Sequence, residues 1–325
     1  FGRHHSFEDF IHRFWRKADV PQQVASTIFL FFASYATPVL LAQVLTHLKF
    51  DLSLRGALLA VSAPLFIAIG LAIRSSKARS LDTAPTWPLY STGYALTAIG
   101  AMISFGDERL AIYVLVLNAI VYAVSAYIFQ QTFWLYLSTM LTPVIALLIL
   151  HKTDHLQSNW IAWIFIGLAY LYFAIGQVFD RSKKAANEIH PFAAPFYVPG
   201  FILSAIALAV SSSDKMLALQ IYSAGVVFYA LAGWRFRESL FIYPASWLAT
   251  VPYFLAITLA PLETRWYGLA WLPLIILYIG LGRFVFHKES LPPLGRGVLG
   301  NWLSHPAVPF YLLAYPPSVT IVPPP

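Results

Sequence analysis

The sequence predicts an all-α protein, a polytopic transmembrane helical bundle of about 10 to 11 spans built from tandem parallel four-helix repeats. Composition predicts the membrane class, because 59% of the 325 residues are hydrophobic and 11% are charged. Soluble domains carry about 25% charged residues. Self-similarity at a period near 106 residues predicts the repeats.

The apolar runs have the length of about 20 residues that crosses a bilayer core. Ten such runs recur along the chain, and an eleventh begins near Val308 and is broken by Pro316 and Pro317. We expect the ten spans at 24–48, 55–73, 87–105, 110–129, 133–150, 160–179, 191–211, 216–234, 240–259 and 266–286.

The basic residues predict the orientation of these spans. With the spans taken in order, fifteen of the 21 Lys and Arg residues fall on the side of the amino end. Basic residues accumulate on the cytoplasmic side of a membrane, so we expect a protein integral to a bacterial plasma (inner) membrane with its amino end cytoplasmic. The net charge of +7 then meets anionic lipids. The expected partners are the lipid bilayer and other membrane proteins or further copies of the chain, and nucleic acid is not expected.

A phrase of prolines and aromatic residues occurs three times, at Pro88–Tyr90, Pro195–Tyr197 and Pro309–Tyr311, spaced by 107 and 114 residues. Proline suits the first turn of a helix, and tyrosine suits the level of the lipid headgroups. We interpret the phrase as the point where each repeat re-enters the membrane from the cytoplasm. Because a repeat of four helices is even, successive repeats keep one orientation, unlike the inverted repeats of many transporters.

The period divides the chain into five segments. We expect an amphipathic helix on the cytoplasmic surface at 1–20, the last two helices of a first repeat at 21–82, complete four-helix repeats at 83–189 and 190–297, and the start of a further, truncated repeat at 298–325. Residues at helical spacing in the first segment are the expected membrane-surface contacts, namely Phe7, Phe10, Phe14, Trp15, Arg16 and Lys17.

The placement of charge bears on function. All fourteen carboxylates fall in or beside predicted loops, whereas proton relays and ion pathways carry charges inside the membrane. An ion-coupled pump is therefore disfavoured. The predicted loops on the external side are short, so we expect no enzyme and no catalytic residue in this portion, and a catalytic part would have to lie outside these residues.

Few polar side chains fall inside the spans, and three are candidates for a polar pathway or a ligand contact: Asn118, Gln220 and Gln43. Asn118 is the strongest of them, because it lies near the middle of its span and Gly225 stands one period later. An interhelical hydrogen bond is the simpler interpretation of such a residue.

The segment HKTDH contains a weak metal candidate made of His151, Asp154 and His155. Two histidines four residues apart share a helical face and can hold zinc if the helix continues through them. No third and fourth ligand is evident nearby, so we interpret these residues as the polar end of a span. We expect no metal site and no cofactor.

These patterns together predict a non-enzymatic multi-pass integral membrane protein that serves as a scaffold, sensor or assembly module, as a fragment of a larger repeat protein. The alternative is a transporter or channel for a neutral or apolar solute. That alternative requires a polar path through the bundle, for which Asn118 is the first residue to test.

Overall fold

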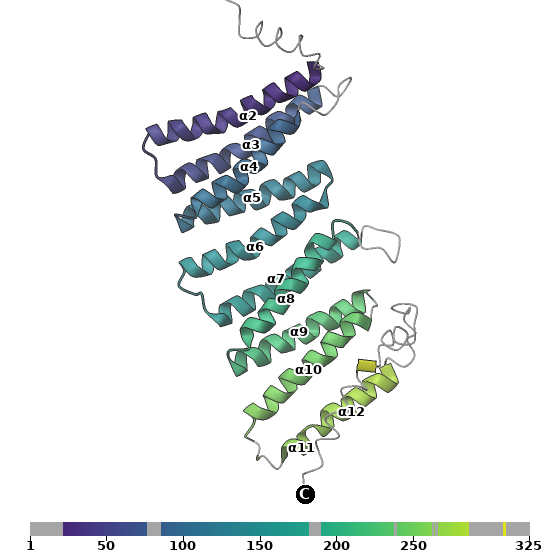
Figure 1. Ribbon diagram of the computed structural model, residues 1–325. Coiled ribbons are helices and arrows are strands. Elements are labelled where there is room, and N and C mark those ends of the chain that lie inside the picture. The colour runs from purple at the N-terminus through teal and green to yellow at the C-terminus, as the bar shows by residue number, and fades with distance from the viewer. Residues whose placement is uncertain are drawn as a thin grey trace, which may run out of the picture. The chain divides into compact units, whose positions relative to one another are not determined.

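The computed structural model describes residues 22–76, 86–181, 190–236, 239–261, 263, 266–285 and 308–309. Within this part every regular element is helical (Figure 1), which confirms the all-α prediction. The predicted amphipathic helix at 1–20, with its surface contacts from Phe7 to Lys17, lies outside the described residues. Most of the predicted segment 298–325 lies outside them as well.

The chain divides into two compact units, Phe1–Lys152 and Thr153–Pro325, called here the N-terminal and C-terminal units. The N-terminal unit contains α2 (Gln22–His47), α3 (Leu52–Ser76), α4 (Trp87–Ser104), α5 (Glu108–Phe129) and α6 (Thr132–Lys152). Helix α3 packs along α4, and α5 packs along α6 (Figure 1). Helix α4 also touches α2 and α5, so three helices, α2, α3 and α5, pack against it.

The C-terminal unit contains α7 (Ser158–Asp180), α8 (Ala194–Ser211), α9 (Lys215–Phe236), α10 (Ser239–Leu259), α11 (Tyr267–Ala270), α12 (Leu272–Gly280) and the π-helical turn η3 (Leu281–Val285). Helix α7 packs along α8, and α9 packs along α10. The boundary between the two units follows Lys152 and therefore falls inside the predicted repeat at 83–189.

Eight of the described helices are long and apolar enough to cross a membrane, namely α2, α3 and α5 to α10. The other two predicted spans, at 87–105 and 266–286, are not among these eight and stay predictions. Helix α4, predicted at 87–105, has 18 residues but includes several serine, threonine and tyrosine side chains that lower its hydropathy. The span predicted at 266–286 is a shorter apolar segment, Tyr267–Arg283, in which α11 ends just before Pro273 in the first turn of α12.

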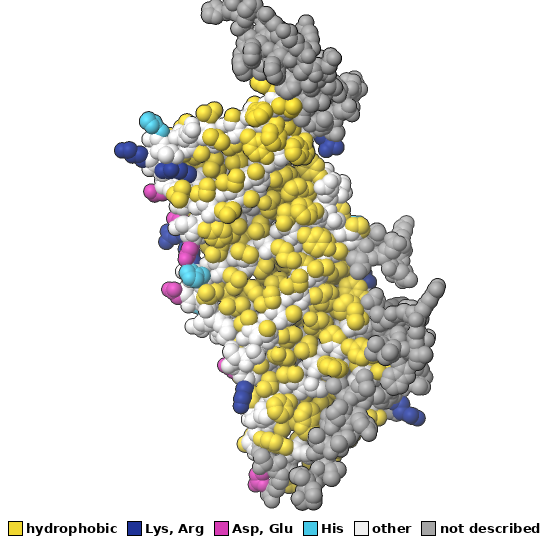
Figure 2. Space-filling model, in the orientation of Figure 1, with side chains coloured by type: hydrophobic (Ala, Val, Ile, Leu, Met, Phe, Trp, Pro, Cys, Tyr) yellow, Lys and Arg dark blue, Asp and Glu magenta, His cyan; other side chains and the backbone are white. Residues whose placement is uncertain are grey.

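The outward surfaces of the helices are apolar. On α5, the side chains of Tyr113, Ile120 and Tyr127 are 70%, 56% and 77% exposed. Figure 2 shows hydrophobic side chains along the flanks of the described helices and charged side chains near helix ends. Large contiguous apolar surfaces are rare on water-soluble monomers, so this distribution indicates a protein embedded in a membrane.

Small residues bring the backbones of α3 and α4 into contact. A Cβ atom added to Gly100 would lie 2.7 Å from the carbonyl oxygen of Gly56 and 2.8 Å from the backbone nitrogen of Ala60. In lipid the hydrophobic effect does not drive helices together, so association depends on such close packing. The pair α7 and α8 likewise meets through small residues, of which Ala162, Ala169 and Ala207 are all fully buried.

The two described proline–tyrosine phrases each press a tyrosine ring against a glycine of the preceding helix. A Cβ atom on Gly70 would lie 2.7 Å from Cε1 of Tyr90, and one on Gly176 would lie 2.5 Å from Cε1 of Tyr197. No side chain fits under either ring. The phrase therefore fixes the start of α4 on the end of α3, and the start of α8 on the end of α7.

We predict that Gly176→Ala destabilises the protein by about 1 to 3 kcal/mol, the usual cost of overpacking a filled interior. The new methyl group would collide with the Tyr197 ring. Gly167→Ala in the same helix is the matched control, because nothing lies within 4 Å of a Cβ atom at Gly167. The melting temperature of the purified protein in detergent measures the difference, and equal values for the two variants would contradict the contact.

Candidate functional site

Asn118 lies in the middle of α5 and is 2% exposed. Its side-chain Nδ2 donates a hydrogen bond of 2.9 Å to the backbone oxygen of Thr97 in α4. Its Oδ1 is buried and has no hydrogen-bond partner. Asn118 thus links two helices through its donor and leaves its acceptor available.

Thr97 is the centre of a polar cluster at the same depth. Its hydroxyl donates to the backbone oxygen of Tyr94, and the Tyr122 hydroxyl lies 2.7 Å from the same Thr97 oxygen. Because Thr97 uses its only hydrogen toward Tyr94, Tyr122 is the donor of that second bond. The rings of Tyr94 and Trp134 stack with centroids 3.8 Å apart, which brings α6 into the cluster.

The polar line continues from this cluster toward the end of the bundle where α4 begins. The Tyr94 hydroxyl faces Ser125, which is 2% exposed, and Tyr90 lies one turn earlier in α4. The hydroxyl oxygens of Tyr90 and Tyr94 are both buried and form no hydrogen bond of 3.5 Å or less, and the Ser125 side chain lies within longer hydrogen-bonding range of the Tyr94 hydroxyl. The Tyr90 ring meets Phe129 edge to face at the end of α5.

The other half of the interface between α4 and α5 is apolar. A buried cluster fills it, formed by Ala57, Ala60, Ala101, Val114 and Leu115. Partly buried leucine and isoleucine side chains of α5 and α6 pack against this cluster. The polar line therefore stops at Asn118 and does not cross the N-terminal unit.

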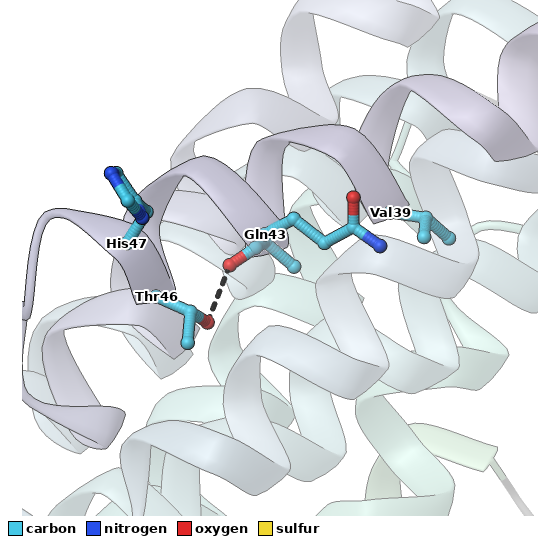
Figure 3. Close-up of a pocket in the computed structure, with 5 residues that line it drawn as sticks. Val39, Gln43, Thr46 and His47 are labelled. Carbon is cyan, nitrogen blue, oxygen red and sulfur yellow. Dashed lines mark hydrogen bonds between the residues drawn. The ribbon is translucent and has the colours of Figure 1, made fainter.

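The other two predicted pathway residues do not join this cluster. Gln43 is exposed on α2, where it lies in an open groove of about 440 Å³ with Val39, Ala42, Thr46 and His47. Figure 3 shows these side chains along a single helix, with the Thr46 hydroxyl bonded to the backbone oxygen of Ala42. Gln220 is exposed on α9. A shared polar pathway through Asn118, Gln43 and Gln220 has no geometric support.

The histidines of the HKTDH segment do not share a helical face. Helix α6 ends at Lys152, and Asp154 has a left-handed backbone with φ of 55°. His151 Nδ1 instead lies 2.8 Å from Glu108 Oε1, across the interface of α6 and α5. Among the described residues, no group of three or more His, Cys, Asp or Glu side chains could hold a metal ion.

The sequence pattern did not single out Asp180, whose carboxylate is the centre of a second polar cluster. It is the last residue of α7, and its side chain is only 5% exposed. Its carboxylate accepts from the Tyr197 hydroxyl at 2.7 Å, from the backbone N–H of His190 at 2.8 Å and from Arg235 at 3.4 Å. These bonds join the ends of α7 and α9 to the start of α8, a convergence that only the fold reveals.

No family model, no curated protein and no solved structure matches this chain. The chemistry of the site therefore follows from its own residues. The Asn118 cluster offers hydroxyl groups, an amide and an indole ring, all of them neutral. Such groups can hydrogen-bond a neutral molecule, and the described cluster contains neither a charged group nor a nucleophile paired with a base.

We predict that Asp180→Asn lowers the stability of the protein by about 1 to 2 kcal/mol, because hydrogen bonds to a charged carboxylate are roughly twice as strong as neutral ones. Arg235, 35% exposed, would also lose its ion-pair partner. Asp154→Asn is the control, since Asp154 is exposed and asparagine tolerates its left-handed backbone. Thermal unfolding of both variants tests this, and a loss no larger than that of the control would show that the network is inert.

Proposed function

We propose that this chain is a non-enzymatic multi-pass membrane module, a scaffold, sensor or assembly unit built from tandem parallel four-helix repeats. The observation that carries the proposal is the use of polar side chains for contacts between helices. Tyr170 donates to the backbone oxygen of Ala224, and Tyr278 donates to that of Ser246. Side chains committed to internal bonds of this kind hold helices together and are not arranged around a reacting centre.

The helix boundaries support the repeats. Helices α4, α5 and α6 begin at Trp87, Glu108 and Thr132, and α8, α9 and α10 each begin 107 residues later. The corresponding ends, at Ser104, Phe129 and Lys152, are displaced by the same 107 residues. Agreement at both ends of three consecutive helices is the pattern expected when one four-helix plan is used twice.

Equivalent hydrogen bonds support the same plan. Asp107 Oδ1 accepts from two backbone N–H groups in the first turn of α5, and Asp214 Oδ1 does so in the first turn of α9. The Thr97–Tyr122 hydroxyl pair has a counterpart in Ser204 and Tyr229, 3.1 Å apart.

The tightest helix pairs suggest how repeats join. The proposed repeat boundaries near 83 and 190 fall between α3 and α4 and between α7 and α8, the pairs that meet through glycine and alanine. Each junction therefore consists of the last helix of one repeat and the first helix of the next. Repeat proteins whose units contact their neighbours in this way form extended platforms, which favours an assembly role.

We place the amino end, and with it the starts of α4 and α8, on the cytoplasmic side of a bacterial plasma membrane. Arg74, Arg181, Arg235 and Arg283 lie near the helix ends on that side in the proposed topology. Among the described residues at those helix ends, the carboxylate is that of Asp180, which is paired with Arg235. The resulting positive charge suits anionic lipid headgroups.

The alternative function, a transporter or channel for a neutral solute, draws its support from the free acceptor of Asn118. A transporter needs a polar path on both sides of that residue. The buried apolar cluster around Val114 and Leu115 opposes such a path, so the module is the better-supported proposal.

We predict that a cysteine replacing Val114 is protected from a membrane-impermeant thiol reagent when the protein is in lipid. Val114→Cys is a small change at a buried position, and the chain has no cysteine of its own. Ile120→Cys, on the exposed flank of α5, should also be protected by the bilayer, while Asp154→Cys in a loop should react. If Val114→Cys reacted while Ile120→Cys stayed protected, a continuous aqueous route would be indicated and transport would be favoured. Reaction of Ile120→Cys would contradict membrane insertion.

A further inference from the structure

Three buried oxygens of the N-terminal unit form no hydrogen bond of 3.5 Å or less: Asn118 Oδ1, the Tyr94 hydroxyl and the Tyr90 hydroxyl. Tyr90 and Tyr94 are one turn apart in α4, and Tyr94 faces Ser125 of α5. A buried polar group without a partner is unfavourable, and such groups are normally bonded to protein or to water. Three such groups on neighbouring helices of one unit indicate a ligand that supplies the missing bonds.

The proposed repeat provides an internal comparison. One period later, the positions of Tyr94, Asn118 and Ser125 are occupied by Phe201, Gly225 and Ala232, none of which has a polar side chain. The position of Tyr90 is occupied by Tyr197, whose hydroxyl is bonded to Asp180. The C-terminal copy thus lacks or satisfies each of the three groups, and the buried hydroxyl without a partner that it does contain, on Tyr243, lies at a different position, in α10.

The shared part of the two copies shows that the polar groups are not required for packing. Phe201 stacks on Tyr229 and on Phe241, in the places that correspond to Tyr122 and Trp134 beside Tyr94. The aromatic stack therefore forms with or without the Tyr94 hydroxyl. Aromatic stacking therefore does not explain why residue 94 carries a hydroxyl group.

The size of the site limits what can enter it. In the C-terminal copy, Leu208 lies over Gly225, where an added Cβ atom would be 3.0 Å from Leu208 Cδ2. In the N-terminal copy, Ala101 and Asn118 occupy these two positions. The exchange of leucine and glycine for alanine and asparagine keeps the side-chain volume nearly constant, so no room for a large solute is gained. Water is the ligand that fits, because it is small and neutral and bonds to two to four groups.

We propose that water enters the N-terminal unit between α4 and α5, from the end at which α4 begins, and reaches Asn118. The water bonds to Tyr90, Tyr94 and Asn118 along the way. The apolar cluster around Val114 closes the other half, so this is a half-length aqueous inlet. The inference rests on the membrane placement proposed above, and it is specific to one copy of the repeat.

The test is the reaction of single cysteines with a charged methanethiosulfonate in sealed vesicles. Ser125→Cys replaces a hydroxyl by a thiol of similar shape at the proposed inlet. Ala232→Cys is the position-matched control in α9, and Ser204→Cys is an isosteric control at a buried hydroxyl of α8. Because only the hydrated thiolate reacts, Ser125→Cys should react on the order of tenfold faster than either control.

The side of entry and the role of the hydroxyls are tested with further variants. Gln131→Cys, exposed in the loop after α5, shows whether the reagent reaches the side of the membrane at which α4 begins. Asp154→Cys shows whether the reagent reaches the opposite side. Ser125→Cys should react only in vesicles of the orientation that exposes Gln131→Cys. Adding Tyr94→Phe, the residue type of the other copy, should slow the reaction of Ser125→Cys.

Two results would overturn the proposal. One is a Ser125→Cys rate equal to that of Ala232→Cys, which would mean a dry interface. The other is equal, rapid reaction at Ser125→Cys and both controls, which would remove the difference between the copies. Ile120→Cys, measured in parallel, separates these outcomes from failure of the membrane placement, since that thiol reacts only if α5 is not covered by lipid.

Discussion

The constraint on which this structure depends is that lipid offers no hydrogen-bond partner. A polar group facing the hydrocarbon region costs several kcal/mol, so burial between helices is favoured for polar side chains within the spans. Helix α4 shows the consequence, because it is rich in hydroxyl side chains and packs against α2, α3 and α5. Apolar side chains such as Ile120 of α5 face outward, where lipid can cover them.

The same constraint explains the close packing of the helix pairs. Without a hydrophobic driving force, α3 and α4 associate through backbone contact, which requires glycine or alanine at each crossing point. Tyr90 on Gly70 and Tyr197 on Gly176 then set where each following helix begins. In the proposed repeat, a copy that carries these few residues would reproduce the same arrangement, while positions such as Asn118 and Gly225 would be free to differ.

Much of the fold could be predicted from the sequence, because length and hydropathy report directly on membrane spans. Helix α4 is not among the eight candidate spans, since hydroxyl side chains that are buried between helices lower hydropathy just as exposed ones do. The segment predicted at 266–286 is a shorter apolar helix, Tyr267–Arg283, within the described residues. The proline–tyrosine phrase was visible, but its contact with a glycine some 20 residues earlier was not.

The candidate site was predicted only in part. Asn118 could be found from its position within a span and from its glycine counterpart. Asp180 could not, because a carboxylate beside a loop is ordinarily solvated, and its burial depends on Tyr197 and Arg235 from two other helices. Gln43 and Gln220 were equally polar in sequence, yet both are exposed. Sequence period alone does not tell which side of a helix faces its neighbours.

The central claim is that one four-helix plan is used twice and is altered at Asn118 in one copy. An experimental structure of the chain in a lipid nanodisc tests it most directly, by superposition of α4–α6 on α8–α10. The account predicts coincident backbones, tyrosine rings on Gly70 and Gly176, and ordered water beside Asn118 but not beside Gly225. Copies that pack with different helix crossings, or a site at Asn118 as dry as that at Gly225, would contradict it.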